Sequence, residues 1–489
     1  MCENDRVSLF NLTRSIASKK MIAYKLISII FICSFLISPS YAEIVDSTNQ
    51  VDKTKSVSNC KLLISGDPLS KFCQQQFKNI TAQVAGLFPE SNSKIITGQR
   101  LGGVFAVYQN NKKCYISCGY RDLNFKERLH AHSVFEIASN TKTFTAAILG
   151  TMHVQKKLNV LHTVQDNLPS GFNLGTDEIN VTYQQLATFS GGFPYSDPPN
   201  AVNPGIKTFP QSSFEADVNS LDPSQLPSVS AYNVNPPQYL PTMNVYSNSS
   251  FGLLGQILAN IEYPGVAFDD SLLNALYCQY ILNPLKMYES NTCMPSQAQN
   301  GNCLSYNDVC VAQSKWQKLD YVPGFRIDNS SETFISAAFF PYQPWAPAGA
   351  MRSSPSDMLK YMQMILGVNS KTPTLTEGAN LGLNSNNYLP VPEGEKPRIN
   401  HPAPNSPSHQ GWAWVVLPAN ANHNPNTIQF KLGGHVGFNS FIGVDKSLGY
   451  ALVILTNTGP DKSGKANPNP NSNLQTLGVN IMIEASSGQ

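Results

Sequence analysis

The stretch VFEIASNTKTFTAAIL, residues 134–149, decides the fold prediction, and its centre is the tetrapeptide Ser139-Asn140-Thr141-Lys142. Residues three apart share one face of a helix, so a helix beginning here brings the Lys142 amine to the Ser139 hydroxyl. A serine needs an adjacent base to become a nucleophile, and a lysine can serve when burial or nearby positive charge lowers its pKa. The apolar residues on both sides predict that this helix is buried.

The pattern Ser-x-x-Lys is weak by itself, because it also occurs at Ser58–Lys61 and Ser91–Lys94. Those two copies lie in polar stretches with no apolar helix behind them. Without further support, Ser139 fits an ordinary serine near a helix start equally well. Whether Ser139 is a nucleophile or an ordinary serine therefore depends on the other motifs of the chain.

Two later segments supply chemistry that a serine nucleophile requires. Tyr246-Ser247-Asn248 precedes an apolar helical run at 251–258 and offers a phenol and an amide at a loop tip. His435-Val436-Gly437 follows the strand-like residues 430–434 and places a cation or hydrogen-bond donor beside a glycine-flanked strand. A lone histidine is also commonly a hydrogen-bonded structural residue, and that alternative stays open.

In this order, the three segments resemble the serine β-lactamase and penicillin-binding protein superfamily. The resemblance is strongest to the branch of class C β-lactamases, D-alanyl-D-alanine carboxypeptidases, D-aminopeptidases and related esterases. Segments 181–194, 347–353 and 455–457 also resemble that branch, and the resemblance covers about residues 95–485. It implies an α+β fold of the β-lactamase/transpeptidase type: an antiparallel sheet flanked by helices, plus a mostly helical subdomain.

The resemblance also implies roles for individual residues. Ser139 would be the nucleophile, Lys142 its base or proton shuttle, and Tyr246 a second acid/base. Asn248 would bind the substrate amide and His435 would be the cation of the third motif. Gly437 and Phe438 would bind substrate, with the oxyanion hole formed by the backbone N–H groups of Ser139 and Phe438.

One departure affects the expected activity. Class C β-lactamases carry Lys-Thr-Gly at the third motif, whereas the prediction assigns His435-Val436-Gly437 to it. This favours a D-alanyl-D-alanine carboxypeptidase or endopeptidase acting on peptidoglycan stem peptides through a Ser139 acyl-enzyme. A β-lactamase or an esterase/D-aminopeptidase is the alternative, and a sensor that is acylated by a β-lactam without turnover is a further one. No Gly-x-Ser-x-Gly occurs, which argues against an α/β-hydrolase.

The amino-terminal residues 1–42 have the features of a signal peptide: lysines, a short apolar run at 26–37 and small residues at 40 and 42. The run is short for a retained membrane anchor, the competing interpretation. We expect export, to the periplasm or as a secreted protein. Without this segment, whose charge is +3, the chain is close to neutral. A neutral chain gives no reason to expect nucleic acid or a membrane surface as a partner.

The remaining chain is predicted to be a 43–94 extension followed by a 95–485 hydrolase domain with insertions at about 195–245 and 286–330. Strands are expected at 103–108, 115–120, 411–417, 427–432, 440–444 and 450–457, and helices at 72–87, 144–153, 251–258, 351–366 and 474–485.

Eight cysteines follow residue 42, an even number that suggests disulfides in an exported protein. Sequence proximity favours Cys60–Cys73 and a local cluster among Cys278, Cys293, Cys303 and Cys310. Cys114 and Cys118 are too far apart within one strand to pair with each other. We expect no cofactor and no metal, since His130 and His132 have no third ligand in view.

Overall fold

We describe a computed structural model of the chain. The residues it describes are 44–45, 59–63, 70–174, 181–191, 193, 211–219, 246–328, 330–368, 371–383, 389–390, 409–420, 424–460 and 469–487. The predicted signal peptide and most of the 195–245 insertion lie outside them. The chain divides after Ile44, within the two-residue strand β1 (Ile44–Val45), and the following description concerns the part from Val45 onward.

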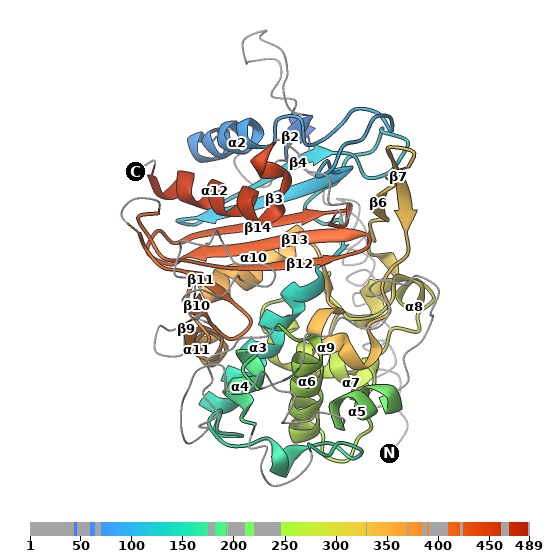
Figure 1. Cartoon of the computed structure of the whole chain (residues 1–489), viewed down its shortest axis with the longest axis vertical. Helices are drawn as coiled ribbons and strands as arrows, with labels where there is room; N and C mark the ends of the chain where they lie inside the picture. The colour runs from blue at the N-terminus through green and yellow to red at the C-terminus, as the bar shows by residue number, and fades with distance from the viewer. Residues whose placement is uncertain are drawn as a thin grey trace, which may run out of the picture. The chain divides into compact units, whose positions relative to one another are not determined.

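An antiparallel sheet forms the centre of this part (Figure 1). Its neighbouring strands are, in order, β2 (Cys60–Leu63), β4 (Lys112–Gly119), β3 (Gly102–Gln109), β14 (Tyr450–Thr456), β13 (Phe438–Asp445), β12 (Ile428–His435), β11 (Val415–Leu417), β10 (His409–Gln410) and β9 (Leu389–Pro390). The early hairpin β3–β4 therefore pairs with the last strand, β14, and closes the amino- and carboxyl-terminal halves into one sheet.

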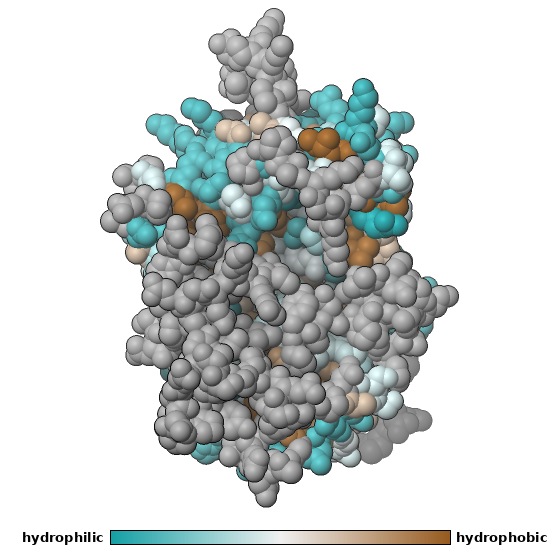
Figure 2. Space-filling model, in the orientation of Figure 1, coloured by the Kyte–Doolittle hydropathy of each residue, from teal (hydrophilic) through white to brown (hydrophobic). Residues whose placement is uncertain are grey.

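The sheet is buried on both faces, which explains why its strands are almost continuously apolar. Side chains alternate between the faces of a strand. In β3, Val104 and Ala106 belong to one apolar cluster and Phe105 and Val107 to another. The second cluster lies under α2 (Lys71–Gln83) and α12 (Leu474–Ser487), and hydrophilic side chains gather over these two helices (Figure 2).

The opposite face is covered by α3 (Thr141–Val154) and α10 (Pro355–Ile365), beyond which lies the mostly helical region (Figure 1). Its helices are α4 (Tyr183–Ala187), α5 (Gln211–Asn219), α6 (Asn248–Glu262), α7 (Asp270–Tyr277), α8 (Pro295–Gln299), α9 (Ala346–Gly349) and α11 (Pro373–Leu381), with a π-turn at Cys278–Leu282 and 3-10 turns at Ala138–Asn140 (η2), Gln165–Asn167, Tyr306–Asp308, Gln313–Lys318, Gln343–Trp345 and Pro470–Ser472. Within the described residues, no helix combines the length and the apolar composition needed to cross a bilayer.

Two small sheets connect the helical region to the central sheet. β5 (Phe135–Glu136) pairs with β8 (Arg352–Ser353), and β6 (Gly324–Asp328) pairs with β7 (Thr333–Ala337). The predicted α+β class and β-lactamase/transpeptidase arrangement are confirmed. Ser354 caps α10 through a hydrogen bond from the Asp357 N–H, so this helix begins at Pro355, in agreement with the sequence signal of Ser353 or Ser354 and Pro355 at its start.

In the described part of the 43–94 extension, β2 extends the central sheet and α2 packs against α12. Two sequence expectations need correction. The 195–245 stretch, expected to be irregular, contains the helix α5. The expected strand at 411–417 is reduced to β11, preceded by the short β10.

Four disulfides join all eight cysteines that follow residue 42: Cys60–Cys118, Cys73–Cys114, Cys278–Cys310 and Cys293–Cys303. The predicted local cluster is confirmed, but the predicted Cys60–Cys73 pair is wrong. The reason is strand register, because β2 lies antiparallel to β4 with Cys60 directly opposite Cys118. Disulfides are typical of exported proteins, and this fits the predicted export.

Candidate active site

Ser139 lies in the short turn η2, immediately before the buried helix α3. Every residue of α3 from Thr141 to Met152 is buried, as the apolar flanks predicted. The helix start directs its positive dipole end toward the serine. Ala138 has a φ of 47°, a left-handed backbone conformation that residues other than glycine seldom adopt. The chain thus turns sharply just before Ser139.

Two groups lie within hydrogen-bonding distance of the serine hydroxyl. Ser139 Oγ is 2.5 Å from the Tyr246 hydroxyl and 3.2 Å from Lys142 Nζ. Lys142 Nζ also donates to Asn248 Oδ1 at 2.6 Å and to the Ala348 carbonyl at 2.8 Å. These two acceptors fix the position of the lysine amine, and a further hydrogen of the amine is directed at Ser139 Oγ.

Tyr246 and Asn248 reach the serine because α6 begins between them. Ser247 is the N-cap of this helix and accepts a hydrogen bond from the Ser250 N–H at 3.2 Å. The structure thus brings together four of the predicted residues, from two segments more than 100 positions apart: Ser139, Lys142, Tyr246 and Asn248.

A second cation, which the sequence prediction missed, lies beside the same tyrosine. Lys431 Nζ is 4.9 Å from the centre of the Tyr246 ring, and Lys142 Nζ is 4.8 Å from it. Lys431 is 3% exposed, and burial lowers its pKa to about 7. Within the described residues, no hydrogen bond or ion pair reaches its amine. The sequence signal was present as Lys431-Leu432-Gly433, inside the strand itself.

Gly433 lets β12 approach the serine turn closely. A Cβ atom at this position would lie 2.2 Å from the Ile137 carbonyl oxygen and 3.1 Å from the Asn140 nitrogen. The neighbouring strand is tied to the same turn, because Ser440 Oγ donates to the Ile137 carbonyl at 2.8 Å and Asn140 Nδ2 donates to Ser440 Oγ at 2.9 Å. The strand backbone and the nucleophile turn are therefore in direct contact.

The geometry does not support the roles predicted for His435, Gly437 and Phe438. His435 lies four residues beyond Lys431, about 13 Å further along an extended strand, and its Nε2 is 2.8 Å from Glu136 Oε2. Gly437 belongs to the two-residue turn between β12 and β13, and its carbonyl accepts a hydrogen bond from Phe325 N–H. The Phe438 ring is buried against Phe135 and Phe339.

The predicted oxyanion donor changes for the same reason. His435 and Phe438 are the pair that closes a two-residue hairpin turn, and such a pair exchanges backbone hydrogen bonds. The Phe438 N–H therefore faces the His435 carbonyl and is occupied in the ladder. Strand register thus places Lys431, four residues before His435, beside Tyr246.

Comparisons with known proteins agree with this fold. The family model described as "Beta-lactamase" matches residues 77–474. A Pseudomonas fluorescens β-lactamase is 29% identical over 156 residues, 32% of this chain and 37% of the relative. A Yersinia enterocolitica β-lactamase is 23% identical over 52% of this chain and 58% of its own. Protein flp of Staphylococcus aureus (strain MW2) is 21% identical over 69% of this chain and 56% of its own. The chain thus spans between about a third and three fifths of these relatives' length.

Solved structures extend the likeness of the fold. A class C β-lactamase from Rhodobacter sphaeroides has a TM-score of 0.55 at 17% identity, covering 84% of this chain and 100% of that one. A β-lactamase/D-alanine carboxypeptidase from Pseudomonas syringae has a TM-score of 0.57 at 16% identity. The match covers 84% of this chain and 97% of that one.

Fold and site geometry together define the class of serine hydrolases that use a Ser-x-x-Lys helix beside an antiparallel sheet. The chain belongs to the β-lactamase family, as the match over residues 77–474 shows.

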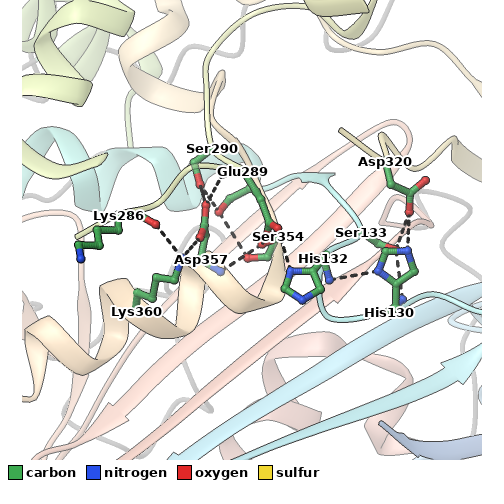
Figure 3. A network of polar contacts seen from close by, with 11 residues as sticks. His130, His132, Ser133, Lys286, Glu289, Ser290, Asp320, Ser354, Asp357 and Lys360 are labelled. Atoms are coloured by element: carbon green, nitrogen blue, oxygen red, sulfur yellow. Dashed lines mark hydrogen bonds and ion pairs between the residues drawn. The ribbon is translucent and has the colours of Figure 1, made fainter. Parts of the chain in front are cut away.

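A separate polar network attaches the 286–330 insertion to the strand that leads to Ser139 (Figure 3). Asp320 accepts hydrogen bonds from Arg121 at 2.8 Å and Ser133 at 2.9 Å, and its Oδ2 is 3.1 Å from His130 Nε2. His132 pairs instead with Glu289, at 2.8 Å. The two histidines thus face different carboxylates, and the described residues contain no cluster suited to a metal.

Replacing Asp320 with asparagine is expected to lower the free energy of unfolding by about 1–2 kcal/mol at pH 7. Burial by itself would raise the pKa of Asp320, but His130, Arg121 and Ser133 hold it well below its usual value. A lowered carboxyl pKa gives stability that is present above the ordinary value of 3.8 and lost as the pH falls through the folded value. The difference between wild type and Asp320→Asn in urea unfolding should therefore shrink below pH 4. A difference that persists unchanged at pH 3 would contradict this reasoning.

Proposed function

We propose that this chain hydrolyses β-lactams through a covalent Ser139 acyl-enzyme. The observation that carries the proposal is the convergence of two groups on the Ser139 hydroxyl, with a buried lysine beside one of them. Ser139 Oγ lies within hydrogen-bonding distance of Tyr246 and Lys142, and Lys431 flanks the same tyrosine. A nucleophile with its base, a second acid/base and a buried cation are the parts that acyl transfer needs.

In the acylation step, Ser139 Oγ attacks the lactam carbonyl while its proton passes to Lys142 or Tyr246. The lactam C–N bond then breaks, and the proton is delivered to the leaving nitrogen by Tyr246. Lys431 as an ammonium ion, and Lys142 once it has taken up the serine proton, both lie within 5 Å of the centre of the Tyr246 ring, so their positive charge favours the phenolate form during this transfer. In deacylation, a water molecule attacks the ester and the same groups return the proton to Ser139.

The developing oxyanion would be held by the backbone N–H groups of Ser139 and Gly434. Backbone hydrogen bonds alternate along an antiparallel pair, so the Gly434–Asn439 pair, next to His435–Phe438, does not exchange them. The Gly434 N–H then points away from β13. On that side, in the described part of the chain, β11 pairs with residues 428–430 of β12 and no strand pairs with Lys431–Gly434, where a substrate could bind.

The two remaining side chains would orient the substrate. Lys431 is the cation available for a substrate carboxylate, and Asn248 can present its amide nitrogen to an acyl-side carbonyl because its oxygen accepts from Lys142. The argument that favoured a peptidase over a β-lactamase rested on a histidine at the third motif. Because Lys431 takes that position, we place β-lactam hydrolysis first.

A second candidate is D-alanyl-D-alanine carboxypeptidase or endopeptidase activity on peptidoglycan stem peptides. Its support is the likeness to a protein named as both β-lactamase and D-alanine carboxypeptidase, matched over 97% of that protein. Both activities require access to the cell wall or its antibiotics. Export, to the periplasm or beyond, therefore belongs to the proposal, and the four disulfides support it.

The test is intact-protein mass spectrometry of the mature chain and its Ser139→Ala variant after incubation with a labelled penicillin. A transient adduct on the wild type alone, with the penicillin consumed, is the expected result. A stable adduct without turnover would indicate a penicillin-binding peptidase or a sensor. The absence of any adduct would refute the proposal and leave esterase or aminopeptidase chemistry, for which thioester and D-amino-acid amide substrates provide the assay.

A further inference from the structure

One buried carboxylate connects the segments that surround the nucleophile. Glu136 lies in β5, three residues before Ser139, and is 2% exposed. Its carboxylate accepts hydrogen bonds from the Arg352 guanidinium of β8 and from the Phe340 N–H, and His435 Nε2 of β12 lies 2.8 Å away. A buried charge is tolerated only when it is paired in this way. Burial opposes its ionisation, but Arg352 and His435 hold the pKa of Glu136 below its usual value.

His435 is buried against this carboxylate: its side chain is 4% exposed and its Nε2 lies 2.8 Å from Glu136 Oε2. Its ring also packs against the rings of Phe340 and Phe438. The imidazole therefore links β12 directly to the strand that precedes the serine turn.

Among the described residues, the stretch of β12 that faces the serine has a strand partner on one edge: β13 pairs with it, whereas β11 ends its pairing at Phe430. Side-chain contacts join the hairpin to the serine turn and to the strand before it: Ser440 to Ile137 and Asn140, and His435 to Glu136. Gly434 lies between the positions of these contacts along the hairpin.

We infer that His435 is a positioning residue, which sets the distance between the backbone N–H of Gly434 and that of Ser139 through its contact with Glu136. The inference rests on the proposed acyl-enzyme function. Without this contact, the described residues hold this stretch to the serine turn through Ser440 and the close approach of Gly433. A displacement of about 1 Å in an oxyanion donor is enough to slow acyl transfer by two orders of magnitude.

Two amide variants test the inference. The amide nitrogen of glutamine reaches the place of imidazole Nε2, whereas that of asparagine is one methylene short of it. We expect His435→Asn to reduce the acylation rate constant by about 30- to 100-fold. His435→Gln should keep it within about threefold of the wild type, because the donor to Glu136 is restored. The dissociation constant of the non-covalent complex should change little in both, since the side chain of residue 435 is buried, with 4% of it exposed.

Stopped-flow measurement with a chromogenic cephalosporin separates these two constants. His132→Asn is the matched control, because His132 forms a histidine–glutamate contact of the same 2.8 Å length outside the site. It should leave the acylation rate unchanged. Equal rates for the asparagine and glutamine variants of His435, in protein shown by circular dichroism to be folded, would overturn the inference. A wild type that no acyl donor acylates would instead overturn the proposed function.

Discussion

Lys431→Met is expected to stabilise the protein while it slows acylation. The lysine is buried without a counter-charge among the described residues, and burial lowers its pKa from 10.5 to about 7. Burying an ammonium costs folding free energy, and methionine removes the charge while it retains most of the volume. We expect the free energy of unfolding to rise by about 2–4 kcal/mol at pH 6.

The pH dependence of this gain has a definite sign. The folded-state pKa lies below the unfolded one, so the unfolded chain binds more protons between pH 7 and 10.5 and wild-type stability rises with pH across that window. The advantage of methionine should therefore be largest below pH 7 and nearly absent at pH 10. Urea unfolding of both proteins across this range measures it.

The same substitution should reduce the acylation rate by about 100- to 1000-fold, because a preorganised cation beside the reacting groups is lost. Lys113→Met on β4 is the control, since that lysine is exposed and outside the site. The control should alter neither the free energy of unfolding nor the acylation rate noticeably. A Lys431→Met variant that is destabilised at pH 6, or that acylates like the wild type, would contradict the assignment.

Gly433→Ala is expected to reduce acylation by about 100-fold or more and to cost about 1–3 kcal/mol of stability. The added methyl group would lie 2.2 Å from the Ile137 carbonyl oxygen and 2.5 Å from Ser440 Oγ. The first of these is backbone and cannot rotate away, so β12 has to move from the serine turn. That movement displaces Gly434 and Lys431 together.

Gly443→Ala in β13 separates this effect from general strain. Its methyl group would lie 2.3 Å from Met482 Sδ, a flexible side chain on the opposite, α12 face of the sheet. We expect some loss of stability and a normal acylation rate in the folded protein. If both variants lost activity equally, the close approach at Gly433 would have no special role.

Local patterns in the sequence were sufficient for much of the fold. The apolar helix after Ser139 appears as α3, and the run after Asn248 appears as α6. The late strands and the final helix also lie where alternation and periodicity predicted them, within a few residues. These features depend on neighbours in the chain, and a periodicity of 3.6 or 2 residues records them directly.

For the candidate site, too, part of the arrangement followed from the sequence and part from the tertiary structure. The sequence by itself determined the pair Ser139–Lys142, since a helix fixes the relation between residues three apart. Only the tertiary structure decided that Lys431, and not His435, faces Tyr246, and that Cys60 pairs with Cys118 rather than Cys73. Both outcomes depend on strand register, because sliding or extending a strand by a few residues changes which side chains meet while its own pattern stays the same.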